Sequence, residues 1–419
     1  MSRESQKTTE NLIKTLEEAL ERTPYKLNEE LSKEADPLIK DDVILSVIIP
    51  ARNEFPNVVH TVHNILAIWE ADGFNIKDLE IIIVDNCSTD TELDRPATRG
   101  TTTYLEARGL YHSRILRILR DPIAGNHSAR NKGAAMARGK YLFFSDAHMS
   151  YAPGTFKYLI ETTEKYGGMV HAAIAWMGAY RHGIGYQYTI KLGDEIRGTW
   201  ANYQVSDQPF YISSLGHCSV MISRKEFWSD KCPRYPVYHR TYGGGEFFWN
   251  WGMWMTGSTV MVDPRAVGHH LAAGRGYTYH SDDLKHNVFN CAYALGMDDW
   301  LERNYIDWLR RGRKEVLDRM MAEAKKEMAE TRIRIERHRV MTFNEMLVRK
   351  PWDEMNMKLH GRKNSSMLIY HDSWLPSLNR TPAKEVYENS PTQKELEKFI
   401  NENLSQYVYK RVHPTVKPA

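Results

Sequence analysis

Short apolar runs alternate with helical segments along the chain, and this pattern constrains its possible folds more than any other feature of the sequence. Residues 55–69 and 128–137 carry apolar side chains at helical spacing. Around them lie mostly apolar runs of strand length, at Ile44–Ile49, Leu79–Val84, Ile115–Leu119 and Tyr141–Ser145. Such runs are typical of strands that are buried on both faces. The alternation therefore predicts an α/β fold, in which a mostly parallel sheet is flanked by helices.

Composition excludes several broad classes of protein. The net charge of the 419 residues is only +3, so the chain as a whole gives no sign of a nucleic-acid or membrane partner. No two of the four cysteines have CxxC spacing, so we expect free thiols in a reducing compartment. Residues 1–37 lack an apolar signal core, and no run of about 18 apolar residues occurs. We therefore expect a soluble, cytoplasmic protein without a signal peptide or a membrane span.

The chain divides into three parts by composition and pattern. Residues 1–42 are polar, with apolar side chains on one helical face, and predict an N-terminal helical arm. Residues 43–282 form the α/β domain. Residues 283–419 predict a mostly helical region, with a further helix at 393–404. Residues 308–350 contain 13 Lys and Arg against 7 Asp and Glu, which favours a partner-binding module. A charged helix face in water is the alternative.

The triplet Asp146-Ala147-His148 directly follows the apolar run that ends at Ser145. Open α/β sheets bind ligands at the carboxyl edge of their strands. A carboxylate oxygen and a neutral imidazole together suit a borderline divalent ion such as Mn²⁺ or Zn²⁺. The alternative is a strand end whose polar side chains simply meet water. Further polar motifs at the same predicted edge favour a metal site.

Two of these motifs follow the first two predicted strands. Pro50-Ala51-Arg52-Asn53-Glu54 is a turn that exposes backbone N–H groups at the ligand edge, and the segment 85–90 begins with Asp85. An acidic residue at a strand end can accept hydrogen bonds from a base or a ribose hydroxyl. In a third motif, at 126–134, Arg130 and Lys132 are placed to contact phosphate. Each motif alone is also typical of turn caps or of solvated helix charges.

Two later motifs add glycine, carboxylate and histidine. In Gly243-Gly244-Gly245-Glu246, the glycines allow the backbone to approach a ligand closely, and Glu246 is expected to start a helix. The segment Val267-Gly268-His269-His270-Leu271 is expected in a loop after a strand at 259–262. A lone histidine is more often structural, but two adjacent ones near a metal-type triplet favour ligation by one of them.

In this order the motifs resemble those of the GT-A glycosyltransferases. The segments 47–54 and 83–90 are similar to family 2. The later motifs resemble the polypeptide N-acetylgalactosaminyltransferases, in Ala-Arg-x-x-Gly-Ala, Phe-x-Asp-x-His, Gly-Gly-Glu and Val-Gly-His at 129–134, 144–148, 244–246 and 267–269. The resemblance covers about residues 44–280. It implies a GT-A type nucleotide-diphospho-sugar transferase domain with a helical C-terminal extension.

The resemblance also implies an activity and a set of site residues. The expected reaction is metal-dependent transfer of a sugar from a nucleotide-diphospho-sugar, expected to be a UDP-sugar, to an acceptor hydroxyl. Asp146, His148 and His269 would bind the ion, expected to be Mn²⁺, with Mg²⁺ as the alternative. Glu246 would be the catalytic carboxylate. The implied donor-binding residues are Pro50, Ala51, Arg52, Asn53, Glu54, Asp85, Arg130, Gly244, Gly245 and Tyr277.

The chain departs from the family pattern at several positions. Gly243 stands where the family has Trp, Ala272 where it has Arg, and the family's lectin domain is not found. Inverting relatives place an Asp base directly after the Glu, and here that position is Phe247. Either Glu246 is the base, or the reaction retains configuration without one. Both routes stay open.

The acceptor is open as well, with a glycan, a protein or a hydroxymethylated base in DNA as the candidates. A basic C-terminal helix in a chain without a lectin domain is compatible with the DNA-directed alternative. A further hypothesis is a non-catalytic nucleotide-sugar-binding protein, but the intact metal triplet favours an enzyme. The sequence predicts neither the sugar nor the oligomeric state.

Overall fold

The computed structural model describes residues 43–89, 115–176, 186–191, 196–202, 208–270, 277–310 and 314–361. The predicted N-terminal arm at 1–42 and the predicted helix at 393–404 lie outside these residues. So does Ala272, one of the departures from the family pattern.

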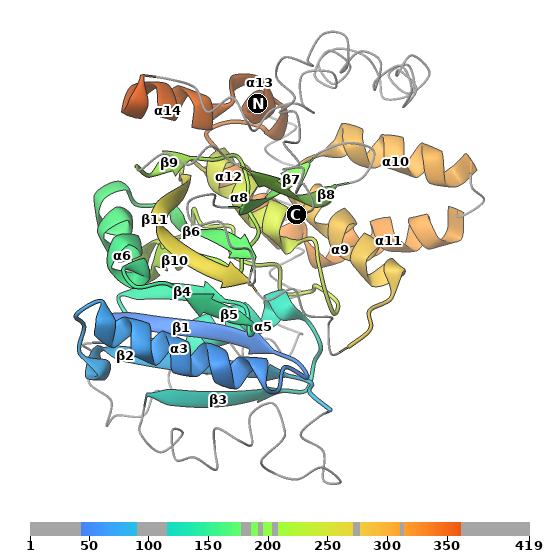
Figure 1. Cartoon of the computed structure of the whole chain (residues 1–419). Coiled ribbons are helices and arrows are strands. Elements are labelled where there is room, and N and C mark those ends of the chain that lie inside the picture. The colour runs from blue at the N-terminus through green and yellow to red at the C-terminus, as the bar shows by residue number, and fades with distance from the viewer. Residues whose placement is uncertain are drawn as a thin grey trace, which may run out of the picture.

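One mixed sheet of 11 strands forms the centre of the described structure, with a main order of β3-β2-β1-β4-β10-β6-β11-β5 (Figure 1). Its first half is entirely parallel and contains β1 (Leu45–Ala51), β2 (Leu79–Asn86), β3 (Leu116–Asp121) and β4 (Tyr141–Ser145). In its second half, antiparallel pairs join β5 (Met149–Tyr151), β6 (Met169–Trp176), β10 (Ser219–Ser223) and β11 (Val260–His270), except for the parallel pair of β6 and β11. The predicted α/β class is confirmed, and the sheet is mixed because the strands beyond β4 reverse direction.

Short strands extend the second half of the sheet. A hairpin of β7 (Tyr186–Lys191) and β8 (Arg197–Asn202) continues from β6, and β9 (Phe210–Tyr211) pairs with β11. The sequence did not predict these strands, since the segment at 177–214 shows no regular apolar pattern.

Two layers of helices cover the sheet, and each has its own hydrophobic core. Along β1, Val47 and Ile49 face one core while Ile48 faces the other, as expected for a strand with period-two alternation. On one face lie α3 (Asn57–Ala71), the short helix η1 (Ile76–Asp78) and α6 (Thr155–Tyr166). On the other face lie α5 (Asn126–Met136), α7 (Arg224–Phe227), α8 (Gly245–Met255) and α9 (Ser281–Ala294). Burial on both faces explains why most residues of the central strands are apolar.

Five further helices follow α9, at Asp298–Arg310 (α10), Lys314–Glu327 (α11), Ala329–His338 (α12), Phe343–Arg349 (α13) and Pro351–His360 (α14). The ring of Trp254 in α8 lies 6.0 Å from that of Trp352 in α14, and Asn356 exchanges two hydrogen bonds with the backbone of Tyr211. These helices therefore continue the hydrophobic core that covers the α8 face of the sheet. Within the described ranges, no helix has the length and apolar character that crossing a membrane requires.

Strand β11 contains an irregularity between Asp263 and Val267. These two residues pair with the consecutive residues Ala172 and Ala173 of β6, so three residues of β11 have no counterpart on the partner strand. The carboxylate of Asp263 accepts hydrogen bonds from Thr162 Oγ1 at 2.6 Å and from Arg265 Nη2 at 2.7 Å. This buried network fixes the bulge, which in turn sets the direction of the strand beyond it.

Candidate functional site

The loops after β1 and β2 are joined at the carboxyl edge of the sheet. Ala51 and Asp85 are register partners at the ends of the two strands. The backbone N–H of Asn53 donates to Ser88 Oγ at 3.0 Å, and the N–H of Thr89 donates to Asn53 Oδ1 at 2.7 Å. Asn53 adopts a positive φ of 55°, which asparagine tolerates better than most residues. The two predicted nucleoside-binding motifs therefore form one connected surface.

Asp85 is buried beneath this surface and is already engaged by protein groups. Its Oδ2 lies 3.3 Å from Nη1 of Arg120, and its Oδ1 accepts from the backbone N–H of Ser88 at 3.3 Å. The carboxylate thus supports the loop that it begins while keeping a fixed orientation at the strand end.

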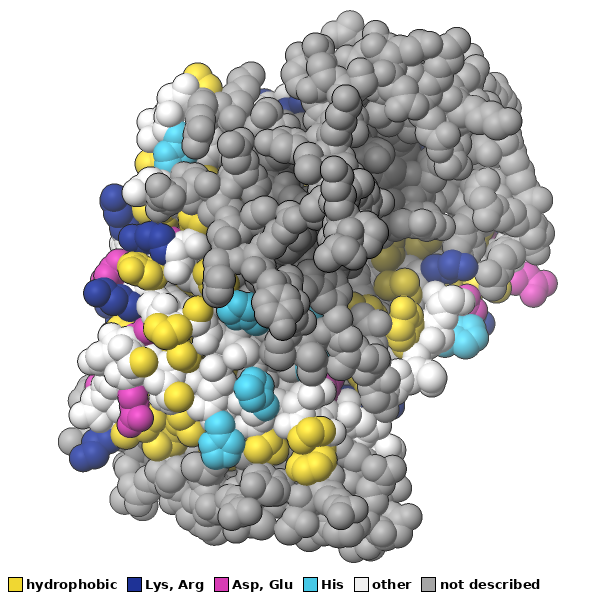
Figure 2. All heavy atoms as spheres, in the orientation of Figure 1, with side chains coloured by type: hydrophobic (Ala, Val, Ile, Leu, Met, Phe, Trp, Pro, Cys, Tyr) yellow, Lys and Arg dark blue, Asp and Glu magenta, His cyan; other side chains and the backbone are white. Residues whose placement is uncertain are grey.

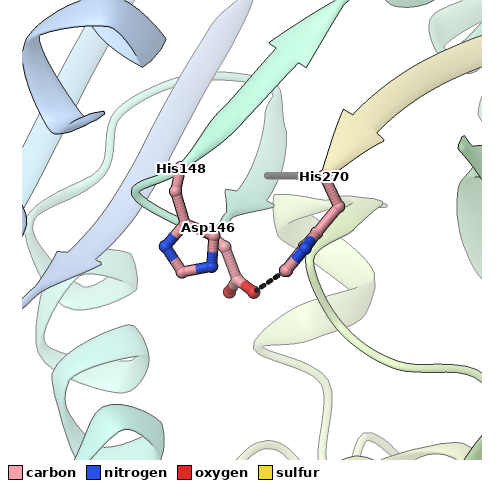
Figure 3. Close-up of side chains that lie close together, drawn as sticks. All are labelled: Asp146, His148 and His270. Carbon is pink, nitrogen blue, oxygen red and sulfur yellow. Dashed lines mark ion pairs between the residues drawn. The ribbon is translucent and has the colours of Figure 1, made fainter. Parts of the chain in front are cut away.

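Asp146, His148 and His270 form a cluster at the adjoining end of β4 (Figure 3). One ligand atom from each residue lies within 4.8 Å of the others. Asp146 directly follows β4, His148 lies between β4 and β5, and His270 is the last residue of β11. The three side chains come from two segments, the β4–β5 connection and the end of β11, and they point toward one another. Among the residues that the structure describes, this is the one group with metal-ligand geometry.

The third member of the cluster is His270, whereas the sequence prediction named His269. His270 Nε2 lies 3.6 Å from Asp146 Oδ2. The segment at 267–270 was expected in a loop, but it belongs to β11, where His269 pairs with Ser150 and His270 with Met149. Successive side chains of a strand point to opposite faces, so only one of the two adjacent histidines can face Asp146.

Charged neighbours hold the cluster in place. Arg130 Nη2 lies 2.6 Å from Asp146 Oδ1, and Glu54 Oε2 lies 3.2 Å from His148 Nδ1. Burial raises the pKa of Asp146, but the hydrogen bond with His270 and the charge of Arg130 lower it by more, so the pKa lies well below its usual range. When Nδ1 of His148 donates to Glu54, its Nε2 keeps a lone pair for a metal.

The cluster is accessible from solvent. Between 18% and 26% of each of its three side chains is exposed. Figure 2 shows several histidine side chains on the described part of one face of the molecule, mostly among apolar and uncharged atoms. A ligand can therefore reach the three groups without a rearrangement of the core.

The start of α8 forms a second side of the site. Gly243 and Gly244 have φ values of 91° and 88°, which favour glycine, and the helix begins at Gly245. Asn287 of α9 donates to the carbonyls of Arg240, Tyr242 and Gly243, at 2.7 to 3.1 Å. This clamp fixes the turn that leads into the glycine run.

Glu246 lies in the first turn of α8, where the helix N-terminus stabilises a negative charge. Arg130 connects it with the metal-type cluster. Burial lowers the pKa of Arg130, but Tyr235, Asp146 and Glu246 raise it by more. Both carboxylates thus act on the same guanidinium. Geometry also links the two carboxylates: on α5, His127 Nε2 lies 3.7 Å from Glu246 Oε2, and Arg130 Nη2, one turn later, lies 2.6 Å from Asp146 Oδ1.

Arg52 and Tyr277 are also brought together. The Arg52 guanidinium carbon lies 4.9 Å from the centre of the Tyr277 ring, within the range of a cation–π interaction. Arg52 belongs to the turn after β1, and Tyr277 follows the segment 271–276, which is outside the described residues. Two predicted donor-binding residues, 225 positions apart by their numbers, therefore meet at the rim of the site.

Sequence reasoning left one group of this site undecided and missed others. The adjacent histidines were expected to supply one ligand, and the resemblance implied His269, with His270 as the next candidate; the alternation of β11 decides between them once the strand is extended to its observed end. No sequence pattern indicated the role of Asn287, because a single polar residue within a helix has no spacing or motif that distinguishes it from other polar residues. The same holds for the buried rings of His127, His217 and Tyr235, which surround Arg130 and Glu246.

Comparisons with known proteins agree with this architecture. The crystal structure of GalNAc-T7 with UDP, GalNAc and Mn2+ superposes with a TM-score of 0.51 at 16% identity, over 72% of this chain and 61% of that chain. The chain thus spans less than two thirds of the GalNAc-T7 chain. S. aureus TarS 1-349 in complex with UDP-GlcNAc gives a TM-score of 0.44 at 12% identity, over 85% of this chain and 91% of that one, a likeness too low to support an argument.

These results define the class of fold, which is the predicted GT-A type. Residues 46–190 match the sequence model described as Glycosyl transferase family 2. The predicted similarity to family 2 is thereby confirmed over these residues, and the likeness to GalNAc-T7 supports the predicted fold. A comparison with curated proteins gave no match.

Proposed function

We propose that this protein is a metal-dependent glycosyltransferase that moves a sugar from a UDP-sugar to an acceptor hydroxyl. The observation that carries the proposal is the cluster of Asp146, His148 and His270, which adjoins the Glu246 carboxylate at the ligand edge of a GT-A type sheet. The match to family 2 supports the reaction class. The presence of UDP, GalNAc and Mn2+ in the GalNAc-T7 structure supports the donor and the ion.

The donor set fits the proposed ion. One carboxylate oxygen and two imidazole nitrogens suit Mn²⁺, whereas Mg²⁺ prefers oxygen ligands alone. When bound, the ion would supply positive charge that stabilises the diphosphate leaving group. Arg130 holds the Asp146 carboxylate toward the site, and Glu54 orients the His148 ring. We assign the third ligand position to His270 in place of His269.

The remaining side chains take roles that follow from their positions. The linked loops that carry Asn53 and Asp85 form the floor on which the nucleoside lies. Arg52 and Tyr277 border this floor, with the guanidinium available to anionic or carbonyl oxygens of the donor. Contact of Gly244 and Gly245 with the sugar stays a prediction, because their side-chain positions face the protein groups Asn287 and His127. Glu246 places a negative charge beside the anomeric carbon, where an oxocarbenium-like state develops positive charge.

Hydrolysis of the donor tests the proposal without knowledge of the acceptor. The full chain is incubated with a panel of nucleotide-diphospho-sugars in Mn²⁺, Mg²⁺ or EDTA, and release of the nucleoside diphosphate is measured. We expect release from a UDP-sugar in Mn²⁺, loss of release in EDTA, and recovery when Mn²⁺ is restored. No release from any donor, together with no UDP binding by calorimetry, contradicts the proposal.

Glu246→Gln tests the catalytic carboxylate separately, because it removes the charge and nearly preserves the shape. We expect turnover to fall by about 100-fold, as for the loss of one preorganised electrostatic contact, while UDP affinity stays unchanged. Wild-type turnover of this variant would assign Glu246 a structural role.

A further inference from the structure

A buried histidine from α5 supplies a hydrogen-bond acceptor that the first turn of α8 lacks. The first N–H groups of a helix have no partner within the helix, and a side chain at the N-cap usually accepts one of them. The N-cap of α8 is Gly244, which has no side chain. His127 Nε2 instead accepts from the N–H of Gly245 at 3.1 Å, from a position 118 residues earlier in the chain.

The ring of His127 is fitted closely to the backbone of Gly245. The side chain is fully buried, stacks on Tyr235 at 5.3 Å between ring centres, and meets His239 edge-on at 5.1 Å. A Cβ atom at position 245 would approach the ring to 2.6 Å, so any larger residue would displace the ring or the helix start. The bond therefore depends on glycine at this position.

The chemistry of the ring keeps it from neutralising the nearby carboxylate. Because Nε2 accepts from Gly245, the proton of the neutral ring resides on Nδ1. Burial lowers the pKa of His127 well below its usual range, so the ring is uncharged. Glu246 Oε2 lies 3.7 Å from Nε2, beyond hydrogen-bond distance. A lysine or arginine here would instead pair with Glu246 and cancel its charge.

From this geometry we propose that His127 is a positioning residue, which fixes the backbone at Gly245 and thereby aims the Glu246 carboxylate at the reacting sugar. The inference rests on the proposed role of Glu246. His127 acts through the helix start and makes no contact with the donor.

The test compares His127→Phe, which keeps a flat ring and removes the acceptor, with His127→Gln, whose amide oxygen can accept from Gly245. We expect turnover of H127F to fall by roughly 10- to 100-fold, as for a misplaced catalytic group, with little change in UDP affinity. H127Q should recover most of this loss. Should H127F fail to fold, His127→Asn replaces it, since its shorter amide does not reach Gly245.

A double-mutant cycle with E246Q separates positioning from general structural damage. If His127 acts through Glu246, H127F causes little further loss of turnover in the E246Q background, although both backgrounds lose the same thermal stability. His239→Phe is the matched control, because it alters a buried ring that packs on His127 without bonding α8, and it should keep wild-type turnover.

Two outcomes overturn the inference, namely wild-type turnover of H127F, or equal fold losses from H127F in the wild-type and E246Q backgrounds. Wild-type turnover of E246Q alone is a different failure. It contradicts the proposed role of Glu246 before any change is made at His127.

Discussion

The two sides of the candidate site are held in place by different interactions. One side is the cluster of Asp146, His148 and His270. There, Asp146 and His148 are each paired with a charged partner, and their side chains are partly exposed. On the Glu246 side, the turn and helix start are held by uncharged, fully buried groups, namely the ring of His127 and the amide of Asn287.

This difference separates two ways of losing activity. The charged side chains of the first side are themselves the groups that a ligand would contact, so their substitution changes binding. The buried amide and ring of the second side hydrogen-bond to protein backbone, so we expect their substitution to change the direction of the proposed catalytic carboxylate, Glu246. We therefore expect binding defects from the first side and rate defects from the second.

The largest effect that distinguishes the two sides is expected at the adjacent histidines. His270→Ala removes a group of the cluster and should weaken Mn²⁺ binding by about 10- to 100-fold, the range seen when metal sites lose a supporting group. His269→Ala is the matched control and should leave the metal affinity nearly unchanged. Calorimetric titration with Mn²⁺ measures both. Stronger loss in H269A than in H270A would restore the original assignment of His269.

A smaller effect is expected at the clamp on the glycine turn. Asn287→Ala removes the hydrogen-bond donor of one buried carbonyl, that of Gly243, and of two part-buried ones, those of Arg240 and Tyr242, which should cost about 1–3 kcal/mol of stability. Turnover should fall by roughly 10-fold, because the turn before Glu246 loosens, while UDP affinity is kept.

Asn290→Ala is the matched control for this prediction. Asn290 is equally buried on the same helix, but its amide donates to Glu327 and not to the glycine turn. Urea unfolding and steady-state kinetics should show that both variants lose stability and that only N287A loses turnover. Equal loss of turnover in the two variants would mean that the clamp has no specific role.

A change of stability with pH is expected at two buried histidines, and it tests the fold more than the activity. Burial lowers the pKa of His171 and of His239 to about 3. The unfolded chain binds protons at these residues near their ordinary pKa of about 6.5. Their contribution to stability is therefore complete above pH 6.5 and is lost as pH falls below it, by about 1.4 kcal/mol per pH unit for each histidine.

Urea unfolding between pH 7 and pH 5 measures this slope. His171→Phe removes one titrating group, so the slope should fall by the contribution of one proton. An unchanged slope would show that His171 is protonated in the folded protein.

The parts of the molecule that the sequence predicted are those with local patterns. The apolar run Tyr141–Ser145 has the same bounds as β4, and the run Leu79–Val84 lies within β2. Asp146 and His148 were predicted as ligands because they follow a buried strand. Such features depend only on neighbouring residues in the sequence, so they can be predicted from the sequence alone.

The parts that escaped prediction depend on contacts between distant segments. The link between Gly245 and His127 spans 118 residues, and no periodic pattern marks either partner. The alternation that selects His270 became visible only when β11 was seen to continue through residue 270. The antiparallel second half of the sheet was missed because the direction of a buried strand is not encoded in its apolar residues.

The number of residues in the β11 bulge determines which of the two adjacent histidines faces Asp146. Between Asp263 and Val267 the strand advances four residues while β6 advances one, so the pleat beyond the bulge is out of phase with the pleat before it. An insertion or deletion of a single residue there would exchange the faces of His269 and His270 without any substitution. An insertion or deletion during evolution can thus change which histidine faces the cluster. An alignment that matches histidines by identity alone can therefore assign the wrong ligand.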